Sequence, residues 1–246
     1  MYSVQERIST TYTMYSASVN TSRPKTKDAA RLSPDTLVDA AIALADEHGL
    51  EALTIRRLAA EIGVTAMAPY WHFKDKEELL EALGERMFAE VELPPAQDRP
   101  WQAEIGDALR AVLGVLRRHP ALAPLARHTI LSTESGFLVA ERVLSLLSQA
   151  GFDDSATADT GTYLLSSIVT LVTAQPGLTL AAHPDERDRQ MQAKRARLAL
   201  VPADRFPSVA RLAGALIDCQ DPEAYYRRGL DLLVLGLQTL ATTPAR

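Results

Sequence analysis

Cysteine is nearly absent from the sequence, because Cys219 is the single thiol among 246 residues. One cysteine excludes an intramolecular disulfide and a metal site built from several thiolates, and it fits a reducing compartment. No stretch approaches the roughly 18 consecutive apolar residues of a membrane-spanning helix. The first 30 residues also lack the continuous apolar run of a secretory signal. We therefore expect a cytoplasmic protein with no membrane partner.

Catalytic motifs are missing as well. The chain has no GxSxG nucleophile elbow, no GxGxxG or GxxxxGK phosphate loop and no HExxH zinc motif. Cys219 has no close sequence partner that would activate it, so a buried structural cysteine is the default interpretation. His119 and His128 have no carboxylates close to them in sequence and are interpreted as ordinary histidines. We expect no enzyme activity, no catalytic residue, no metal and no cofactor.

A surplus of positive charge is lacking too, since the formal net charge is −5. This value argues against a protein that coats nucleic acid through bulk charge, although phosphate contacts require only local cations. Residues 54–76 carry four cations and two carboxylates, and residues 23–31 carry four cations and one carboxylate. Two adjacent basic segments give an acidic chain the polarity that DNA binding requires. The segment 23–31 is either a minor-groove arm or a solubilising tail.

The sequence does contain helical periodicity. Apolar residues recur at helical spacing after residue 30, without sustained strand-type alternation, so the expected fold class is all-α. Residues 1–30 are expected to be a disordered N-terminal extension. Caps and breakers predict helices from Pro34 to about Gly49, Thr54 to Gly63, Thr65 to about Phe73 and Asp75 to Pro94. Further helices are predicted at about 99–119, 121–131, 135–150, 154–174, 185–199, 207–219 and 222–240. The charged run 185–197 fits a solvated helix better than a mobile loop.

Residues 54–73 read TIRRLAAEIGVTAMAPYWHF, in which a helix, a tight turn at Gly63 and a short helix follow one another. In a helix-turn-helix the second helix presents its N-terminal residues to base edges in the major groove. The same geometry occurs in structural helical hairpins, so the local pattern alone leaves both interpretations open. With the preceding helix, the pattern predicts a three-helix helix-turn-helix DNA-binding domain at 31–78 and a second helical domain at 79–246.

The outward residues of this motif have suitable chemistry for DNA. Arg56 and Arg57 lie in the first turn of their helix, where a guanidinium can bind phosphate or a guanine edge. Thr65 and the free N–H groups of the following helix can bind phosphate. Residues 66–68 are small or flexible and offer apolar contacts to thymine methyl groups.

The aromatic run after these residues has two interpretations. It can line a DNA surface, or it can belong to the core of the domain. We expect Tyr70 and His72 to be partly exposed and Phe73 to be buried, whereas Trp71 stays undecided.

The segment from Pro34 to Leu83 resembles the DNA-binding domain of TetR-family regulators. The resemblance rests on HGLEALTIRRLAAEIGV, on the following YWHF and on KDKEELLEAL. It implies DNA contacts by the first turn of the second helix, by the third helix and by the lysine that opens the fourth. The matching residues are Thr54, Arg56, Thr65, Ala66, Met67, Ala68, Tyr70, Trp71, His72 and Lys76, and Arg57 is added from its position alone.

One residue departs from the family pattern. Pro69 stands where the family usually has leucine, inside the expected recognition helix. Proline lacks an N–H group and restricts the residue before it, so the start of this helix is expected to shift or bend. Pro69 and the readout-poor residues 66–68 keep an alternative open. In this alternative the chain is a helical small-molecule-binding or partner-binding protein with weak or vestigial DNA binding.

Residues 120–175 loosely resemble the C-terminal domain of tetracycline repressors. This resemblance implies a homodimer that represses from a palindromic operator and is released by a small-molecule effector, with coupling through the 79–93 helix. The 154–174 and 222–240 helices are apolar around much of their circumference, which is typical of helices buried between partners. We therefore expect these two helices to form a four-helix dimer interface.

Effector-binding residues are harder to assign. Thr162, Ser166, Thr170 and Thr173 fall close to one helical face, where they either line an apolar pocket or form an outward stripe that bonds back to the helix. The resemblance adds His128, Thr129 and Thr133, and Trp101 is expected in the core or in a pocket wall.

Overall fold

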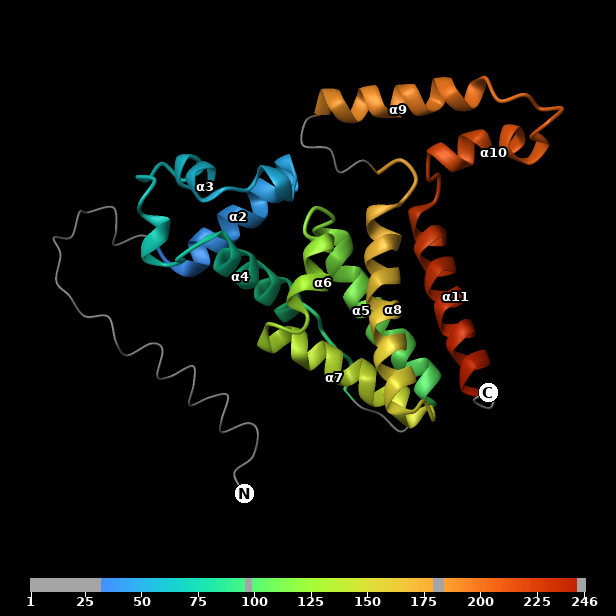
Figure 1. Ribbon diagram of the computed structural model, residues 1–246, viewed down its shortest axis with the longest axis horizontal. Coiled ribbons are helices and arrows are strands. Elements are labelled where there is room, and N and C mark those ends of the chain that lie inside the picture. Colours follow the sequence, from blue (N-terminus) through green and yellow to red (C-terminus); the bar gives the residue numbers. More distant parts are fainter. Residues whose placement is uncertain (1–31, 96–98, 179–183, 243–246) are drawn as a thin grey trace. The chain divides into compact units, whose positions relative to one another are not determined.

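The computed structural model describes residues 32–95, 99–178 and 184–242 (Figure 1). Within these ranges the chain is helical and contains no strand, which confirms the all-α fold class. The basic segment 23–31 and the N-terminal extension lie outside the described residues. No helix of the described part is long and apolar enough to cross a membrane.

The N-terminal helices follow the predicted caps. They are α2 (Pro34–His48), the short 3-10 turn η1 (Leu50–Ala52), α3 (Ile55–Glu61), the 3-10 turn η2 (Pro69–Trp71) and α4 (Lys76–Ala89). Ser33 caps α2 by accepting from the Thr36 N–H over 3.1 Å, and Gly49 ends α2 with a φ of 83°. Helix α2 packs on both α3 and α4. The buried side chains at their junction are Leu37, Val38, Ala41, Leu44, Leu53, Leu58, Phe73, Leu79 and Leu83.

The remaining helices are α5 (Trp101–Arg118), the 3-10 turn η3 (Ala123–Leu125), α6 (Ala126–Thr129), α7 (Glu134–Gln149), α8 (Asp154–Thr173), α9 (Pro184–Ala199), α10 (Pro207–Ile217) and α11 (Pro222–Thr242). Helix α5 packs against α4, α7, α8 and α11, and its inner face supplies much of one continuous apolar core. The predicted bounds of α5 and α7–α11 agree with the structure within two residues.

Outside the helix-turn-helix segment, two predicted helices are wrong in extent. The expected helix at 121–131 is instead a turn, the η3 segment and the single turn α6, because Pro124 cannot donate to a helical carbonyl. Helix α4 ends at Ala89 and not at Pro94. Residues 90–95 continue without helix, and Leu93, which precedes a proline, is biased away from helical angles.

Helix α11 is fastened to α5 and α8 at its N-terminal end. Arg117 on α5 forms an ion pair with Glu223, and its guanidinium lies 4.3 Å from the centre of the Tyr226 ring. The Tyr226 hydroxyl donates to Gln175, just beyond α8. Burial raises the pKa of Tyr226 further above its ordinary value of 10.0, and the protonated hydroxyl is the donor in this bond. Figure 1 shows α8 and α11 running alongside each other beyond this junction.

Candidate functional site

The helix-turn-helix segment begins with a capped helix. The Thr54 hydroxyl accepts from the Arg57 N–H over 3.1 Å, as the sequence predicts for the start of α3. At the other end, Gly63 donates to the Ala60 carbonyl and Val64 donates to the Ala59 carbonyl, which is the Schellman arrangement. Gly63 adopts a φ of 71°, a left-handed conformation that favours glycine. The chain therefore turns sharply after α3 while the carbonyls of Ala59 and Ala60 keep hydrogen-bond partners.

The second helix of the motif is shorter than predicted. The sequence predicts a helix from Thr65 to Phe73, but only the 3-10 turn Pro69–Trp71 forms. Pro69 has no N–H for the Thr65 carbonyl, which accepts instead from the Ala68 N–H over 2.9 Å. Thr65 is consequently not a helix cap. Pro69 occupies the first position of the turn, so the predicted shift of the helix start is observed.

All eleven predicted DNA-binding residues are exposed or half-buried, and α3 and η2 pack together. Met67 and Trp71 are the most open of the large apolar side chains in this segment, with 65% and 72% of their surface exposed. Phe73 is buried, as expected, and Tyr70 and His72 keep part of their surface accessible. Trp71, for which the sequence left both positions open, lies on the surface and not in the core. We name the eleven residues the head surface: Thr54, Arg56, Arg57, Thr65, Ala66, Met67, Ala68, Tyr70, Trp71, His72 and Lys76.

The head surface has cations available for an external partner. Asp75 caps α4 by accepting from the Glu78 N–H over 2.9 Å, while Glu78 accepts from the Lys74 N–H over 2.6 Å. These two carboxylates thus bind backbone groups at the start of α4. Arg56 and Lys76 form no ion pair with the described residues. Phosphate oxygens are suitable partners for such cations.

Three consecutive residues of α4 contact three different helices. Gly84 packs on Thr129 of α6. Glu85 accepts from the backbone N–H and the hydroxyl of Ser135 on α7, over 3.0 and 2.5 Å. Arg86 donates to Asp39 and Asp35 of α2 over 2.7 and 2.8 Å. Helix α4 therefore links the helices of the head surface directly to α6 and α7, through contacts that the local sequence pattern does not predict.

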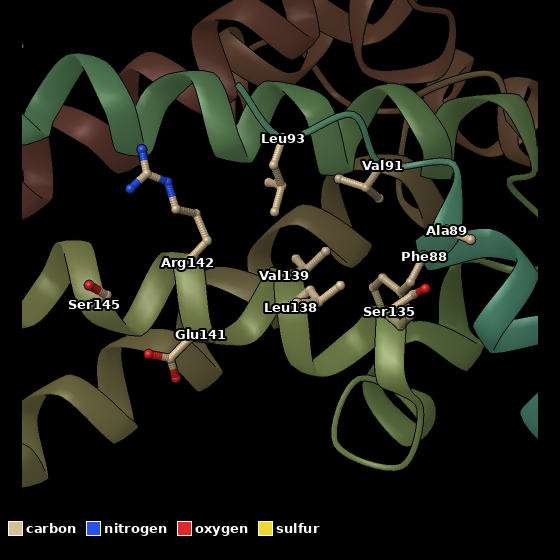
Figure 2. Close-up of a pocket in the computed structure, with 10 residues that line it drawn as sticks. All are labelled: Phe88, Ala89, Val91, Leu93, Ser135, Leu138, Val139, Glu141, Arg142 and Ser145. Atoms are coloured by element: carbon tan, nitrogen blue, oxygen red, sulfur yellow. The ribbon is translucent and has the colours of Figure 1, made fainter. Parts of the chain in front are cut away.

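A groove of about 490 Å³ lies between the end of α4, the segment after it and α7 (Figure 2). In Figure 2, Val91 and Leu93 extend towards Leu138 and Val139 of α7 and form an apolar wall. Arg142 points away from this wall to α5, where it pairs with the buried carboxylate of Glu104. The lining residues are Phe88, Ala89, Val91, Leu93, Ser135, Leu138, Val139, Glu141, Arg142 and Ser145.

None of the predicted ligand-binding residues lines this groove. Trp101 packs on the core, and His128 is exposed. Thr129 and Thr133 are buried, but their hydroxyls donate to the carbonyls of Leu125 and Thr129. Sequence reasoning missed the groove because residues 90–93 were predicted to continue α4.

The hydroxyl row of α8 faces outward. Thr162 and Thr170 are exposed, and each hydroxyl donates to a carbonyl one turn earlier, over 2.9 and 2.8 Å. Thr173 does the same over 3.0 Å, and Ser166 is half-buried. This geometry matches the outward stripe that bonds back to its own helix, and not the wall of an internal pocket.

Two family models together match most of the chain. The model "Bacterial regulatory proteins, tetR family" matches residues 37–83, which contain α3, η2 and the first part of α4. The model "Tetracyclin repressor-like, C-terminal domain" matches residues 93–241, which is more than half of the chain.

Named relatives and solved structures agree with these models. An HTH-type transcriptional regulator of Saccharopolyspora erythraea is 29% identical over 215 residues, covering 85% of this chain and 86% of the relative. The TetR family protein ActR of Streptomyces coelicolor, solved with actinorhodin, superposes with a TM-score of 0.66 at 26% identity, covering 86% of this chain and 99% of ActR. BioQ, solved with its double-stranded DNA operator, superposes with a TM-score of 0.54 at 25% identity, covering 85% of this chain and 99% of BioQ. The chain therefore belongs to the TetR family of bacterial regulatory proteins, which are DNA-binding transcription regulators and not enzymes.

Proposed function

We propose that this chain is a homodimeric repressor that binds a palindromic operator in the bacterial cytoplasm and leaves it when a small molecule binds. Residues 31–78 act as the DNA-binding domain, and residues 79–246 bind the effector and form the dimer. The observation that carries the proposal is the head surface. It combines exposed cations with exposed apolar and aromatic side chains at the end of a capped helix-turn-helix.

Within the head surface, the residues divide by chemistry. Arg56 and Lys76 neutralise phosphates or reach a guanine edge. Met67, Tyr70 and Trp71 supply apolar contacts to bases and to the sugar–phosphate backbone. The short η2 turn presents these side chains in place of a full recognition helix. BioQ, which was solved with its double-stranded DNA operator, is one similar structure that binds DNA.

Apolar side chains left exposed on the far helices support dimerisation. Leu232, Leu235 and Leu240 of α11 and Tyr163 of α8 expose between 58% and 77% of their surface. Large apolar residues concentrated on one helix usually mark an interface. A two-fold axis through α8 and α11 would place two head surfaces on one duplex, with half-sites about one helical turn apart or slightly more.

The groove between α4 and α7 is our candidate effector site. Its walls are largely apolar, and its size suits a drug-sized ligand. A molecule there would touch Phe88 and Ala89 at the end of α4, and Ser135, which binds Glu85. The effector must bind the arrangement that is unsuited to DNA more tightly, because otherwise it cannot shift the equilibrium. ActR, which was solved with actinorhodin, is one similar structure that holds a small ligand.

A salt titration tests the DNA-binding proposal. Duplexes enriched by the protein from a random-sequence library are labelled, and their affinity is measured between low and physiological salt. We expect one enriched sequence, bound with an affinity that falls steeply as salt rises. A protein without an enriched sequence and without salt dependence would be a helical ligand-binding protein whose DNA head is vestigial.

A further inference from the structure

An ionic cluster at the end of α5 contacts both of the helices that lead to the head surface. His119, which ends α5, places its Nδ1 atom 2.7 Å from the Asp46 carboxylate on α2. Its Nε2 atom lies 3.9 Å from one carboxylate oxygen of Glu90, the residue that ends α4. Arg118 donates to the other oxygen of Glu90 over 2.9 Å. The imidazole thus lies between carboxylates from two separate helices.

The position of His119 is fixed by the backbone around it. Its N–H donates to the Val115 carbonyl over 3.3 Å, and its carbonyl accepts from the Leu122 N–H over 2.9 Å. Its side chain is only 20% exposed, and Pro120 restricts the following turn. The ring is therefore held in place and does not have the freedom of a long surface side chain.

The charge of the ring decides how many of these carboxylates it can bind. A neutral imidazole has one N–H and one lone pair, whereas an imidazolium has two N–H groups. When the neutral ring donates to Asp46 through Nδ1, the lone pair of Nε2 faces the Glu90 carboxylate. Protonation replaces that unfavourable pairing with an attraction between opposite charges over 3.9 Å. The imidazolium also lies at the negative end of the α5 macrodipole.

We propose that His119 is a positioning residue, which fastens α2 to the ends of α4 and α5 when its ring is protonated. Among the described residues, the charged groups that face the ring are Asp46 from α2, Glu90 from α4 and Arg118 from α5. Arg118 pairs with Glu90 whether or not the ring is charged, so the group that depends on the ring for an ionic partner is Asp46.

A double-mutant cycle on the full chain tests the fastening without DNA. Wild type, His119→Leu, Asp46→Asn and the double variant are unfolded thermally at about pH 6 and about pH 8. At the lower pH, each single change is expected to lower Tm by about 2–4 °C, and the double variant is expected to lose little more. At the higher pH the coupling between the two changes should be smaller. Additive losses at both pH values would overturn the proposal.

Two further variants separate positioning from simple packing. His119→Arg keeps a cation with several N–H donors at every pH, so its stability relative to wild type should rise as the pH increases. His128→Leu is the control, because it makes the same histidine-to-leucine change at an exposed position of α6. This variant should keep the pH dependence of stability that wild type shows. If His128→Leu loses this pH dependence, then His128 causes it and the proposal for His119 is wrong.

The consequence for DNA rests on the proposed function and has its own readout. A fastened α2 presents the head surface with less freedom, and such pre-organisation favours binding. For a duplex enriched by the wild-type protein, the ratio of affinity at about pH 6 to that at about pH 8 should be about three- to tenfold larger for wild type than for His119→Arg. Equal ratios would overturn the positioning role. If no duplex binds while the unfolding cycle still shows coupling, the fastening stands and the DNA-binding proposal fails.

Discussion

Gly84 and Thr129 pack so closely that a methyl group on Gly84 would overlap the threonine side chain. Thr129 has little freedom to move away, because it is buried and its hydroxyl donates to the Leu125 carbonyl over 3.1 Å. The pair brings the backbone of α4 against α6. The next two residues of α4 then bind α7 and α2, so the stability of this contact affects how all four helices are held.

Substitution of Gly84 by alanine tests this contact. We expect Gly84→Ala to lower the free energy of unfolding by about 1–3 kcal/mol through overpacking, although alanine favours helix. Gly114→Ala is the matched control, since a Cβ at that position of α5 would have no atom within 4 Å outside its own stretch of helix. The control should raise stability by about 0.5–1 kcal/mol. Urea unfolding measures both free energies of unfolding. If the two substitutions changed this free energy in the same direction, the close packing of Gly84 on Thr129 would be contradicted.

A charged residue on α11 tests the dimer interface. Leu232 is 67% exposed, so Leu232→Glu should leave the fold of the protomer intact. In a dimer built on α8 and α11 the same carboxylate would be buried without a partner, and the complex should dissociate. Leu200→Glu is the control, because Leu200 follows α9 and is 83% exposed. Sedimentation should find monomers for the first variant and dimers for the second, and a dimeric Leu232→Glu protein would place the interface elsewhere.

Arg56 tests the cationic part of the head surface. We expect Arg56→Ala to weaken binding to the enriched duplex by about 1–3 kcal/mol if the guanidinium reads a base. If Arg56 contacts only a phosphate, Arg56→Ala should instead weaken binding to all duplexes alike. The slope of log affinity against log salt concentration should then fall by about one. Arg127→Ala, on the exposed side of α6, removes the same charge away from the motif. Fluorescence anisotropy that finds equal affinities for these two variants would remove Arg56 from the head surface.

Pro69 tests the origin of the shortened recognition segment. Pro69→Leu restores a backbone N–H for the Thr65 carbonyl, and we expect residues 65–73 to become a longer helix. The side chains at 66–68 would then take new directions, so the sequence enriched from a random library should change. Unchanged enrichment, together with unchanged amide chemical shifts at 65–68, would show that Pro69 does not set this geometry.

Asp107 provides a prediction on acid stability. Hydrogen bonds from Arg99 and Arg110 lower the pKa of Asp107 below its ordinary value of 3.8. Because the pKa of Asp107 is lower in the folded than in the unfolded chain, its carboxylate stabilises the fold at pH values above the unfolded-state pKa. This contribution is lost as the pH falls through the folded-state pKa. Asp107→Asn should therefore cost about 1 kcal/mol at neutral pH and progressively less below about pH 4. An equal cost at neutral and strongly acidic pH, measured by urea unfolding, would show that the ion pairs do not contribute.

Most of the fold could be predicted from the sequence, because its helices begin and end at residues with local effects. Ser33, Thr54 and Asp75 cap their helices through their own side chains, and Gly49 and Gly63 take positive φ angles where helices end. Such signals act within a few residues of the chain. The same reasoning predicted the burial of Phe73 and the outward position of Tyr70.

The groove and the contacts of α4 could not be predicted in this way. Glu85 and Ser135 are 50 residues apart, and Arg86 is about as distant from Asp35 in sequence. Only the packing of α4 on α2 and α7 brings them together, and helical periodicity does not specify which charged residues of two faces will meet. The ligand candidates on α8 were chosen because they share a face, but periodicity does not decide whether that face points inward.

The two aspartates that Arg86 binds on α2 restrict how this protein can be re-engineered. Transplanting the DNA-reading helices of a relative onto this effector domain is an obvious route to a new biosensor. A graft that ends before α4 would bring a foreign α2 against Arg86 and would leave the guanidinium unmatched unless acidic residues stand at 35 and 39. A cut placed after α4 would instead separate Glu85 from Ser135. A working chimaera therefore needs matched residues on both sides of whichever junction is chosen.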